Sequence, residues 1–328
     1  GPYPIAMQER CLAECAHLNA CSGLFSMRSI VGTIVFLAMM QSAYGASPGE
    51  RAVAWAESQR DATLGAVVAA RKRVNVAESN LTRSRNIERD ISTSKDAAAL
   101  AVVREAITVS EQDLVDAKAL LKRALDLLSR QDKTLAAAKK FIAENGSDAT
   151  LVIPTKGEVR RVLPGKGSFL TDDIAAPLRV GERVEVGPGS SARMFIAGGQ
   201  AEVALSQNSS FTVTRDDAGG DFEALLSEGI GRIRAKLLEP FRHRFEVRTP
   251  LFAVSVRGTD FSFSASSSGG RIEVFSGVVV VQPVGSERSF EVHAGEGCDV
   301  LKDGGIQPVR PLDNRPRENP WSEGRPRS

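Results

Sequence analysis

The segment from Pro48 to Asn145 has no further proline, and Gly49 and Gly65 are its only glycines. Alanine, leucine and charged residues dominate it, which favours helix on propensity alone. In its second half, positions on one helical face follow at steps of 3 and 4 without a break: Leu100, Val103, Ile107, Ser110, Leu114, Ala117, Leu121, Ala124, Leu128, Gln131, Leu135, Ala138 and Ile142. This spacing, kept over about six heptads, is the pattern of a coiled-coil seam.

The first half carries its own seam, again at alternating steps of 4 and 3: Thr63, Val67, Ala70, Val74, Ala77, Leu81 and Ser84. Residues 89–96, RDISTSKD, separate the two seams and are rich in turn-forming and capping residues, with Ser94 a candidate N-cap for the second helix. The sequence therefore predicts an antiparallel helical hairpin over residues 48–145. Each helix would be roughly 60 to 75 Å long at 1.5 Å per residue.

Both seams alternate a large residue with a small one, as in Val67/Ala70 and Leu121/Ala124. Small seam residues let two backbones approach closely, so the hairpin could close on itself as a coiled coil. A narrower alternative is that the hairpin pairs with a second copy to make a four-helix homodimer, and the sequence does not choose between the two. The interspersed charges of the segment indicate a solvated surface rather than a binding stripe.

Composition changes after ENGSD at 144–148, where Gly146 is a helix stop and Val, Phe, Ile and Thr become frequent. Short strands are expected at 151–154, 160–163, 182–186, 192–196, 201–205, 211–214, 231–236, 245–248, 252–256, 261–265, 271–275, 278–282, 290–294 and 298–301. Many short strands separated by glycine turns predict an all-β sandwich, barrel or wrapped roll over residues 149–305. The fold class is thus α+β by segment, a helical hairpin followed by an all-β domain.

The apolar alternation in FEVRTPLFAVSVRGTDFSF, residues 245–263, changes phase twice, and each change turns the later side chains to the other face of a sheet. Pro250 cannot donate to a ladder and is expected to bend the strand. Gly258 is expected to form a bulge or corner. We expect Arg257 and Thr259 to bind carbonyls left unpaired there, so that Arg257→Ala would unfold the β domain.

This stretch, with RIEVFSGVVVV and FEVHAGEGCDV after it, resembles the FecR domain. The similarity covers roughly residues 150–302, and the weaker first half runs from Leu178 to the Gly198-Gly199 pair. The family-motif positions are assigned a structural role: Thr249, Pro250, Arg257, Gly258, Thr259, Phe261, Gly277 and Gly295. The resemblance implies a non-catalytic binding module. Its best-known members are inner-membrane regulators that relay an envelope signal to a sigma factor.

Residues 27–45 have the pattern of a signal peptide: Arg28, an apolar run from Ile30 to Met40, and the small residues Ala43 and Gly45 before the cleavage site. Residues 1–26 are an upstream segment whose origin the residues leave open. A cleaved signal indicates export to the periplasm or cell envelope of a bacterium, and an uncleaved one an inner-membrane anchor. Cys298 would be the only cysteine after the signal, so no disulfide framework is expected.

No motif for catalysis, a cofactor or a metal is present, and the histidines after the signal, His243 and His293, have no catalytic setting. With 42 basic and 40 acidic residues and 5% aromatics, nucleic-acid binding is not expected. The Pro/Arg-rich residues 306–328 predict a flexible tail. The sequence thus predicts a non-enzymatic envelope scaffold that binds an envelope protein or cell-wall component, or alternatively a membrane-anchored relay to a sigma factor.

Overall fold

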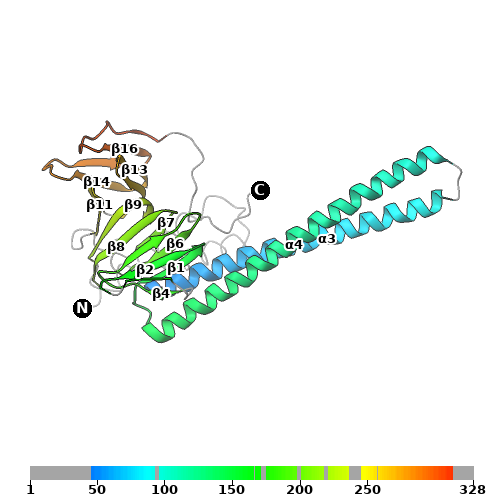
Figure 1. Cartoon of the computed structure of the whole chain (residues 1–328), viewed down its shortest axis with the longest axis horizontal. Coiled ribbons are helices and arrows are strands. Elements are labelled where there is room, and N and C mark those ends of the chain that lie inside the picture. Colours follow the sequence, from blue (N-terminus) through cyan, green and yellow to red (C-terminus); the bar gives the residue numbers. More distant parts are fainter. Residues whose placement is uncertain are drawn as a thin grey trace, which may run out of the picture. The chain divides into compact units, whose positions relative to one another are not determined.

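The structure is a computed structural model that describes residues 46–312 except 93–95, 166, 171–174, 198–200, 218–220, 236–244 and 257, with the side chains of 168–170 also left out. The expected signal peptide at 27–45, the upstream segment and most of the predicted tail lie outside the described residues. Two helices are followed by many strands, so the predicted fold class is confirmed (Figure 1).

The helices are α3, Pro48–Ile91, and α4, Ala97–Asn145. Ser47 caps α3 in a capping box with Glu50, and Pro48 at the first turn needs no hydrogen-bond acceptor. Asp96 caps α4, its carboxylate accepting from the N–H groups of Ala98 and Ala99 at 3.1 Å. The cap therefore lies two residues after the expected Ser94, which is outside the described residues.

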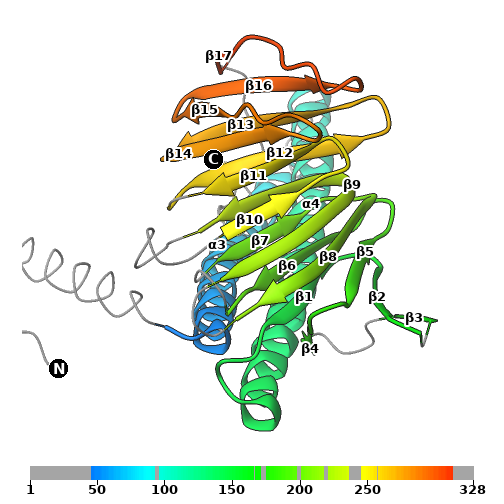
Figure 2. The same cartoon turned by 90° about the vertical axis from the view of Figure 1, so that its left-hand side faces the viewer.

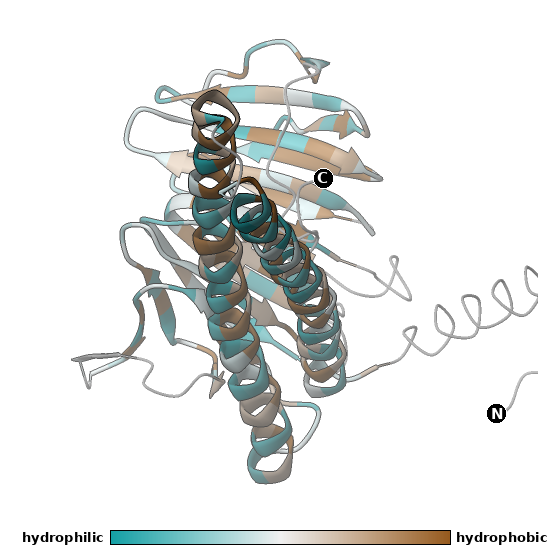
Figure 3. Cartoon of the chain, turned by 90° about the vertical axis from the view of Figure 1, so that its right-hand side faces the viewer, coloured by the Kyte–Doolittle hydropathy of each residue, from teal (hydrophilic) through white to brown (hydrophobic). Residues whose placement is uncertain are grey.

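The predicted seams are the surfaces through which the two helices pack. In α3 the seam residues from Thr63 to Leu81 are buried, and in α4 Ala117 and Ala138 are buried. The larger seam residues of α4, such as Leu114 and Leu128, are half-buried. Figure 3 shows apolar residues recurring along both helices. We call this pair of helices the arm.

The β domain begins six residues after the arm. Its strands are β1 (Leu151–Lys156), β2 (Val159–Leu163), β3 (Gly167–Leu170), β4 (Ala176–Pro177), β5 (Arg183–Val186), β6 (Ser191–Phe195), β7 (Glu202–Leu205), β8 (Ser209–Asp216), β9 (Phe222–Arg234), β10 (Phe245–Arg248), β11 (Phe252–Val256), β12 (Asp260–Ser266), β13 (Gly269–Ser276), β14 (Val278–Pro283), β15 (Phe290–His293), β16 (Glu296–Leu301) and β17 (Arg310–Pro311).

The strands form two layers that share β9. Layer A runs β4-β1-β6-β7-β9-β12-β13-β16-β17, and layer B runs β3-β2-β5-β8-β9-β10-β11-β14-β15. Residues 222–228 of β9 pair in layer B and residues 229–234 pair in layer A. Gly229, with φ of 100°, stands at the crossing. In Figure 2 the strands stack from β17 at one end to β4 at the other, with β9 between them.

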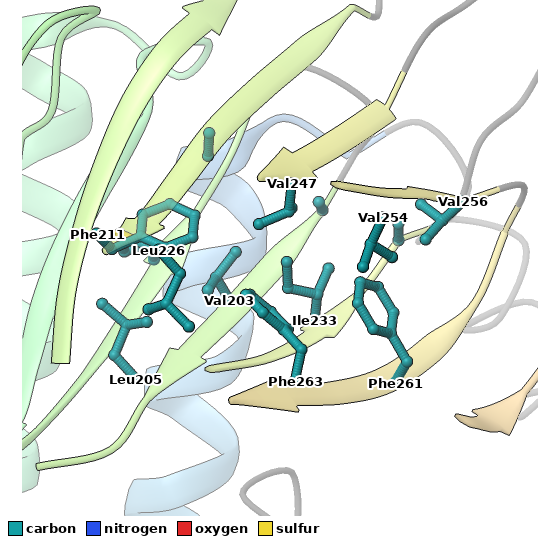
Figure 4. Packing of buried hydrophobic residues seen from close by; sticks show 14 of the residues in the cluster. Val203, Leu205, Phe211, Leu226, Ile233, Val247, Val254, Val256, Phe261 and Phe263 are labelled. Carbon is teal, nitrogen blue, oxygen red and sulfur yellow. The ribbon is translucent and has the colours of Figure 1, made fainter. Parts of the chain in front are cut away.

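Glycine corners pass the chain from one layer to the other and explain the second phase change. β11 ends in layer B at Val256, Gly258 has φ of 79°, and β12 begins in layer A at Asp260. Side chains on both sides of the corner therefore reach one core, as Val254 and Phe261 do in Figure 4. The expected corner at Gly258 is confirmed.

The first phase change has a different cause from the expected bend at Pro250. β10 and β11 pair antiparallel, with Val247 opposite Val254, so the chain reverses direction between them. The Thr249 hydroxyl oxygen accepts from the N–H groups of Leu251 and Phe252 at 3.2 and 3.1 Å and so closes a tight turn. A hairpin, not a bend in a continuing strand, changes the phase here.

Each expected strand overlaps an observed one, but the pattern did not predict β3, β4, β17 or the first half of β9. The polar residues at the middle of β9 interrupt its alternation where the strand changes layers. Paired backbone also extends into the segment predicted as a tail. Ile306 bridges to Val300, and β17 pairs with β16.

Candidate interaction surface

The described family-motif residues lie at turns and corners of the β domain, and the structure does not gather them around a cavity. Thr249 and Pro250 form the β10–β11 turn, and Gly258 and Gly277 are corners between layers. Gly295, with φ of 85°, precedes β16, and its N–H donates to the Val274 carbonyl at 2.8 Å. Arg257 lies outside the described residues, so its expected contacts remain a prediction.

Thr259 and Phe261 are buried beside these corners. Phe261 belongs to the core and is fully buried, with its ring centroid 5.5 Å from that of Phe263. The Thr259 hydroxyl is buried and has no hydrogen-bond partner among the described residues, although the Thr259 carbonyl accepts from Ala235 N at 2.9 Å. The expectation that this hydroxyl binds a carbonyl is thus not met within the described part of the chain.

Among the described residues, the candidates for chemistry are His293 and Cys298. His293 is exposed and lies 3.9 Å from Glu291, and His243 falls outside the described residues. Cys298 is buried, and burial, followed by the charge of Asp299, raises the pKa of its thiol to about 11. Within the described ranges no group of three or more His, Cys, Asp or Glu residues is placed to hold a metal ion. In the same part of the chain, neither helix is apolar enough to span a membrane.

A row of paired charges crosses the outward side of layer A. In the middle of it, Arg232 of β9 donates through Nε and Nη2 to the two carboxylate oxygens of Asp260 on β12, both at 2.9 Å. The Arg232 guanidinium also lies 4.0 Å from the centroid of the Phe275 ring on β13. Arg234 is 3.8 Å from the same Asp260 carboxylate. The geometry holds Arg232 as a rigid, half-buried centre.

The row continues in both directions with alternating sign. On one side, Glu202 of β7 lies opposite Arg234 in the register and 3.6 Å from Arg193. On the other side, Asp299 of β16 lies between two arginines, contacting Arg271 at 3.7 Å and Arg310 at 2.5 Å. We define the charged face as Arg193, Glu202, Arg232, Arg234, Asp260, Arg271, Glu273, Asp299 and Arg310.

The charged face begins under the base of the arm. The Trp55 ring of α3 stacks on the Arg193 guanidinium, 4.9 Å from the ring centroid, and lies 5.9 Å from the Phe195 ring. Ala52, Phe141, Leu151, Ile153 and Phe195 form a buried apolar cluster beneath it. Both helices and strands β1 and β6 contribute to this cluster, so arm and β domain share a core here.

Arg51 ties the arm to the β domain by charge-assisted hydrogen bonds. Its Nη1 donates to the Ala201 carbonyl at 3.0 Å and its Nη2 to the Ile196 carbonyl at 2.5 Å. Burial lowers the pKa of the guanidinium, while the carboxylates of Glu202 and Asp216 act in the opposite direction. Because arginine stays charged in proteins, the buried charge is retained and must be balanced by these groups.

Sequence reasoning identified neither the junction nor the charged face. Arg51 and Trp55 precede the first seam residue, Thr63, so the heptad pattern did not include them. The charged residues of the strands were not singled out, because they carry no motif. A possible signal was Trp55, one of only two aromatic residues in the helical segment, placed at its very beginning.

The comparisons with known proteins concern the β domain. The family model described as FecR protein matches residues 182–280, from the start of β5 into β14. No curated protein matches the chain. Two crystal structures of a candidate anti-sigma factor from Parabacteroides distasonis, at 1.65 and 2.50 Å resolution, are similar at 19% sequence identity and a TM-score of 0.35. The similarity covers 40% of this chain and 60% of the solved chain.

Proposed function

Because residues 182–280 of the chain are a FecR domain, we propose that this is a non-catalytic, exported protein of the bacterial cell envelope. The β domain binds a partner, and the arm sets the distance between that domain and a second attachment point. Residues 27–45 act as the signal peptide in this proposal. The partner is an envelope protein or a cell-wall component. The protein forms a homodimer through the arm.

The junction between arm and β domain is the observation that carries the proposal. A flexible tether would need no shared core, whereas here Arg51 and Trp55 lock α3 onto β6 and its following loop. The apolar cluster under Trp55 includes Phe141 from the other helix, so both helices are held. A rigid joint transmits position and force, which is what a scaffold or spacer requires.

The charged face is the proposed contact surface for the partner. Apart from Arg193, which is buried under Trp55, its members are at least partly exposed and alternate in sign. The hydroxyl groups of Ser262 and Ser264 lie on the same side of β12 as Asp260. Such a surface suits a polar partner that carries both donors and acceptors, as peptides and cell-wall polymers do. Alternating charge across an interface gives specificity more than affinity.

In-cell photocrosslinking tests this surface. A photoreactive amino acid at Ser262 or Ser264 should give an envelope adduct, whereas the same group at the exposed Ser129 of α4 should not. The Asp260→Arg variant, which reverses the central charge, should reduce the adduct from Ser264 while the protein stays folded by circular dichroism. Equal adducts from all three positions would show that the charged face is not the binding surface.

The alternative function is that of a membrane-anchored FecR-type regulator that relays an envelope signal to a sigma factor. It is favoured by the family of the β domain. N-terminal sequencing and fractionation of the protein from its native gene separate the two. A periplasmic chain that begins near Ala46 supports the scaffold, and a membrane-bound chain that keeps residues 30–40 supports the relay.

A further inference from the structure

The two sides of the arm differ in chemistry. On one side, α4 presents a charged residue at every seventh position except Leu125, and each pairs with α3. Five ion pairs join the described parts of the helices in this way: Arg104–Glu88, Glu111–Arg85, Lys118–Glu78, Asp132–Arg60 and Lys139–Glu57. The charged residues of α4 directly follow a seam residue, which places them on one flank of the seam by the 100° rotation per residue.

The opposite flank carries most of the exposed large apolar residues of the arm. Six of the nine lie there: Val76, Ile87, Val102, Val109, Leu120 and Leu127, with exposed fractions from 39% to 67%. On α4 they belong to a second stripe with steps of 4 and 3, which we name the outer stripe: Val102, Ala106, Val109, Asp113, Asp116, Leu120, Arg123 and Leu127. The matching flank of α3 supplies small residues, among them Ala62, Ala66 and Ala69.

Five of the eight positions in the outer stripe are apolar, and Asp113, Asp116 and Arg123 occupy the other three. Apolar residues at 3–4 spacing on an uncovered flank are typical of a helix that packs against a further helix. Isolated exposed leucines or valines are ordinary on a protein surface, but a heptad-spaced row is not. The ion pairs between α3 and α4 lie on the opposite flank, where they stay in contact with water and carry little desolvation penalty. The arm therefore has the two-sided chemistry of a half four-helix bundle.

The charges within the outer stripe identify a second copy of this chain as the occupant. Asp113 and Asp116 precede Leu120 on α4, and Arg123 follows it. If a second α4 crosses antiparallel with the two-fold axis between Ala119 and Leu120, Asp116 of each copy faces Arg123 of the other. A closed two-fold contact requires such self-complementarity, since the same patch serves on both subunits.

We propose that the outer stripe is a homodimer interface, in which two arms pair antiparallel about Leu120 to form a four-helix bundle. This inference identifies the interface of the homodimer named in the proposed function, and it depends on that homodimer but on no other part of the proposed function. The two β domains then lie at opposite ends of the bundle, which makes the dimer a bivalent spacer.

Matched leucines on the two flanks test the interface. Leu120 and Leu125 both have 40% exposed side chains and lie on the same helix, but only Leu120 is in the outer stripe. Analytical ultracentrifugation of the full chain should show a dimer for the wild type and for Leu125→Lys. Leu120→Lys should weaken dimerisation by more than about tenfold, because two leucines are lost from one two-fold contact. Unchanged helical circular dichroism is the check on folding.

A charge exchange tests the register without removing apolar area. Asp116→Arg and Arg123→Asp should each weaken the dimer, and the double variant should restore it, because the facing pair is re-formed with reversed sign. Failure of the double variant to recover would contradict the antiparallel register, even if the single variants behave as expected.

Crosslinking at the two-fold axis gives a direct readout. In a full-length background with Cys11, Cys15 and Cys21 replaced by serine, Leu120→Cys should form a disulfide-linked dimer on mild oxidation. Leu125→Cys should not. A wild-type chain that sediments as a monomer at tens of micromolar, or a dimer insensitive to Leu120→Lys, would overturn the inference. Neither result would affect partner binding by the charged face, which is measured by photocrosslinking at Ser264.

Discussion

The α-carbon of Gly277 lies directly against the carbonyl oxygen of Gly258, so that a β-carbon on Gly277 would be 2.5 Å from that oxygen. The same β-carbon would be 2.7 Å from Cγ2 of Thr259. Two corners of the chain, from β11 to β12 and from β13 to β14, are therefore packed on one another. This contact requires glycine at 277, whereas glycine at 258 is required by its own φ of 79°.

Gly277→Ala should destabilise the β domain by about 3 kcal/mol or more, since the substitution adds both a strained φ of 81° and a clash with backbone. Gly285→Ala is the matched control: Gly285 has φ of 79° and open space around its Cα. It should cost only the backbone strain, about 1 kcal/mol. Urea unfolding followed by circular dichroism measures both, and equal losses would show that the corner contact is unimportant.

Thr249→Val should destabilise the protein by about 1 to 2 kcal/mol, because two N–H groups in the β10–β11 turn lose their acceptor. Thr249→Ser keeps the hydroxyl and should recover most of that loss. The comparison separates the hydrogen bonds from the packing of the methyl group. If Val and Ser variants unfold at the same urea concentration, the hydroxyl is not what closes the turn.

Cys298 makes stability depend on pH in the alkaline range. Its folded pKa of about 11 is raised from 9.0, so the unfolded chain loses the thiol proton first as the pH rises. The stabilisation is complete below pH 9 and is lost between pH 9 and 11, by up to about 2 to 3 kcal/mol. Unfolding free energies of wild type and Cys298→Ala should therefore converge over this range, and a constant difference between them would contradict the buried-thiol assignment.

The arm was the most predictable part of the fold because its heptad pattern is local. Every seam residue follows from the spacing, and the structure buries or half-buries each one. The N-cap of α4 was predictable to within two residues, because Ser94 and Asp96 are equally good caps by residue type. Which of the two acts depends on where the helix begins, and propensity does not fix that point.

The β domain was predictable in its strands but not in its layers. Glycine at 258 indicates a backbone conformation that other residues avoid, and this is enough to predict a corner. The pairing of β9 with strands of both layers depends on contacts between residues far apart in sequence. For the same reason neither the Arg232–Asp260 pair nor the Arg51 contacts to Ile196 and Ala201 could be predicted from the sequence.

The coupling between arm and β domain gives the last prediction. Arg51→Met retains the apolar stem of the side chain and removes the two hydrogen bonds to the Ile196 and Ala201 carbonyls. Hydrogen bonds from a charged donor to buried acceptors are worth about 1.5 to 3 kcal/mol each in such contexts. Loss of both should let the base of the arm separate from the β domain before either unfolds.

Two probes can detect this separation. Far-ultraviolet circular dichroism at the helical minimum follows the arm, and Trp55 fluorescence follows the junction when Trp321, the second tryptophan, is replaced by phenylalanine. The wild type should give coincident transitions, whereas Arg51→Met should lose the Trp55 signal at lower urea. Arg60→Met, which breaks an exposed ion pair with Asp132, should shift stability by less than about 1 kcal/mol and keep the transitions together. Coincident transitions in Arg51→Met would mean that the apolar cluster alone holds the joint.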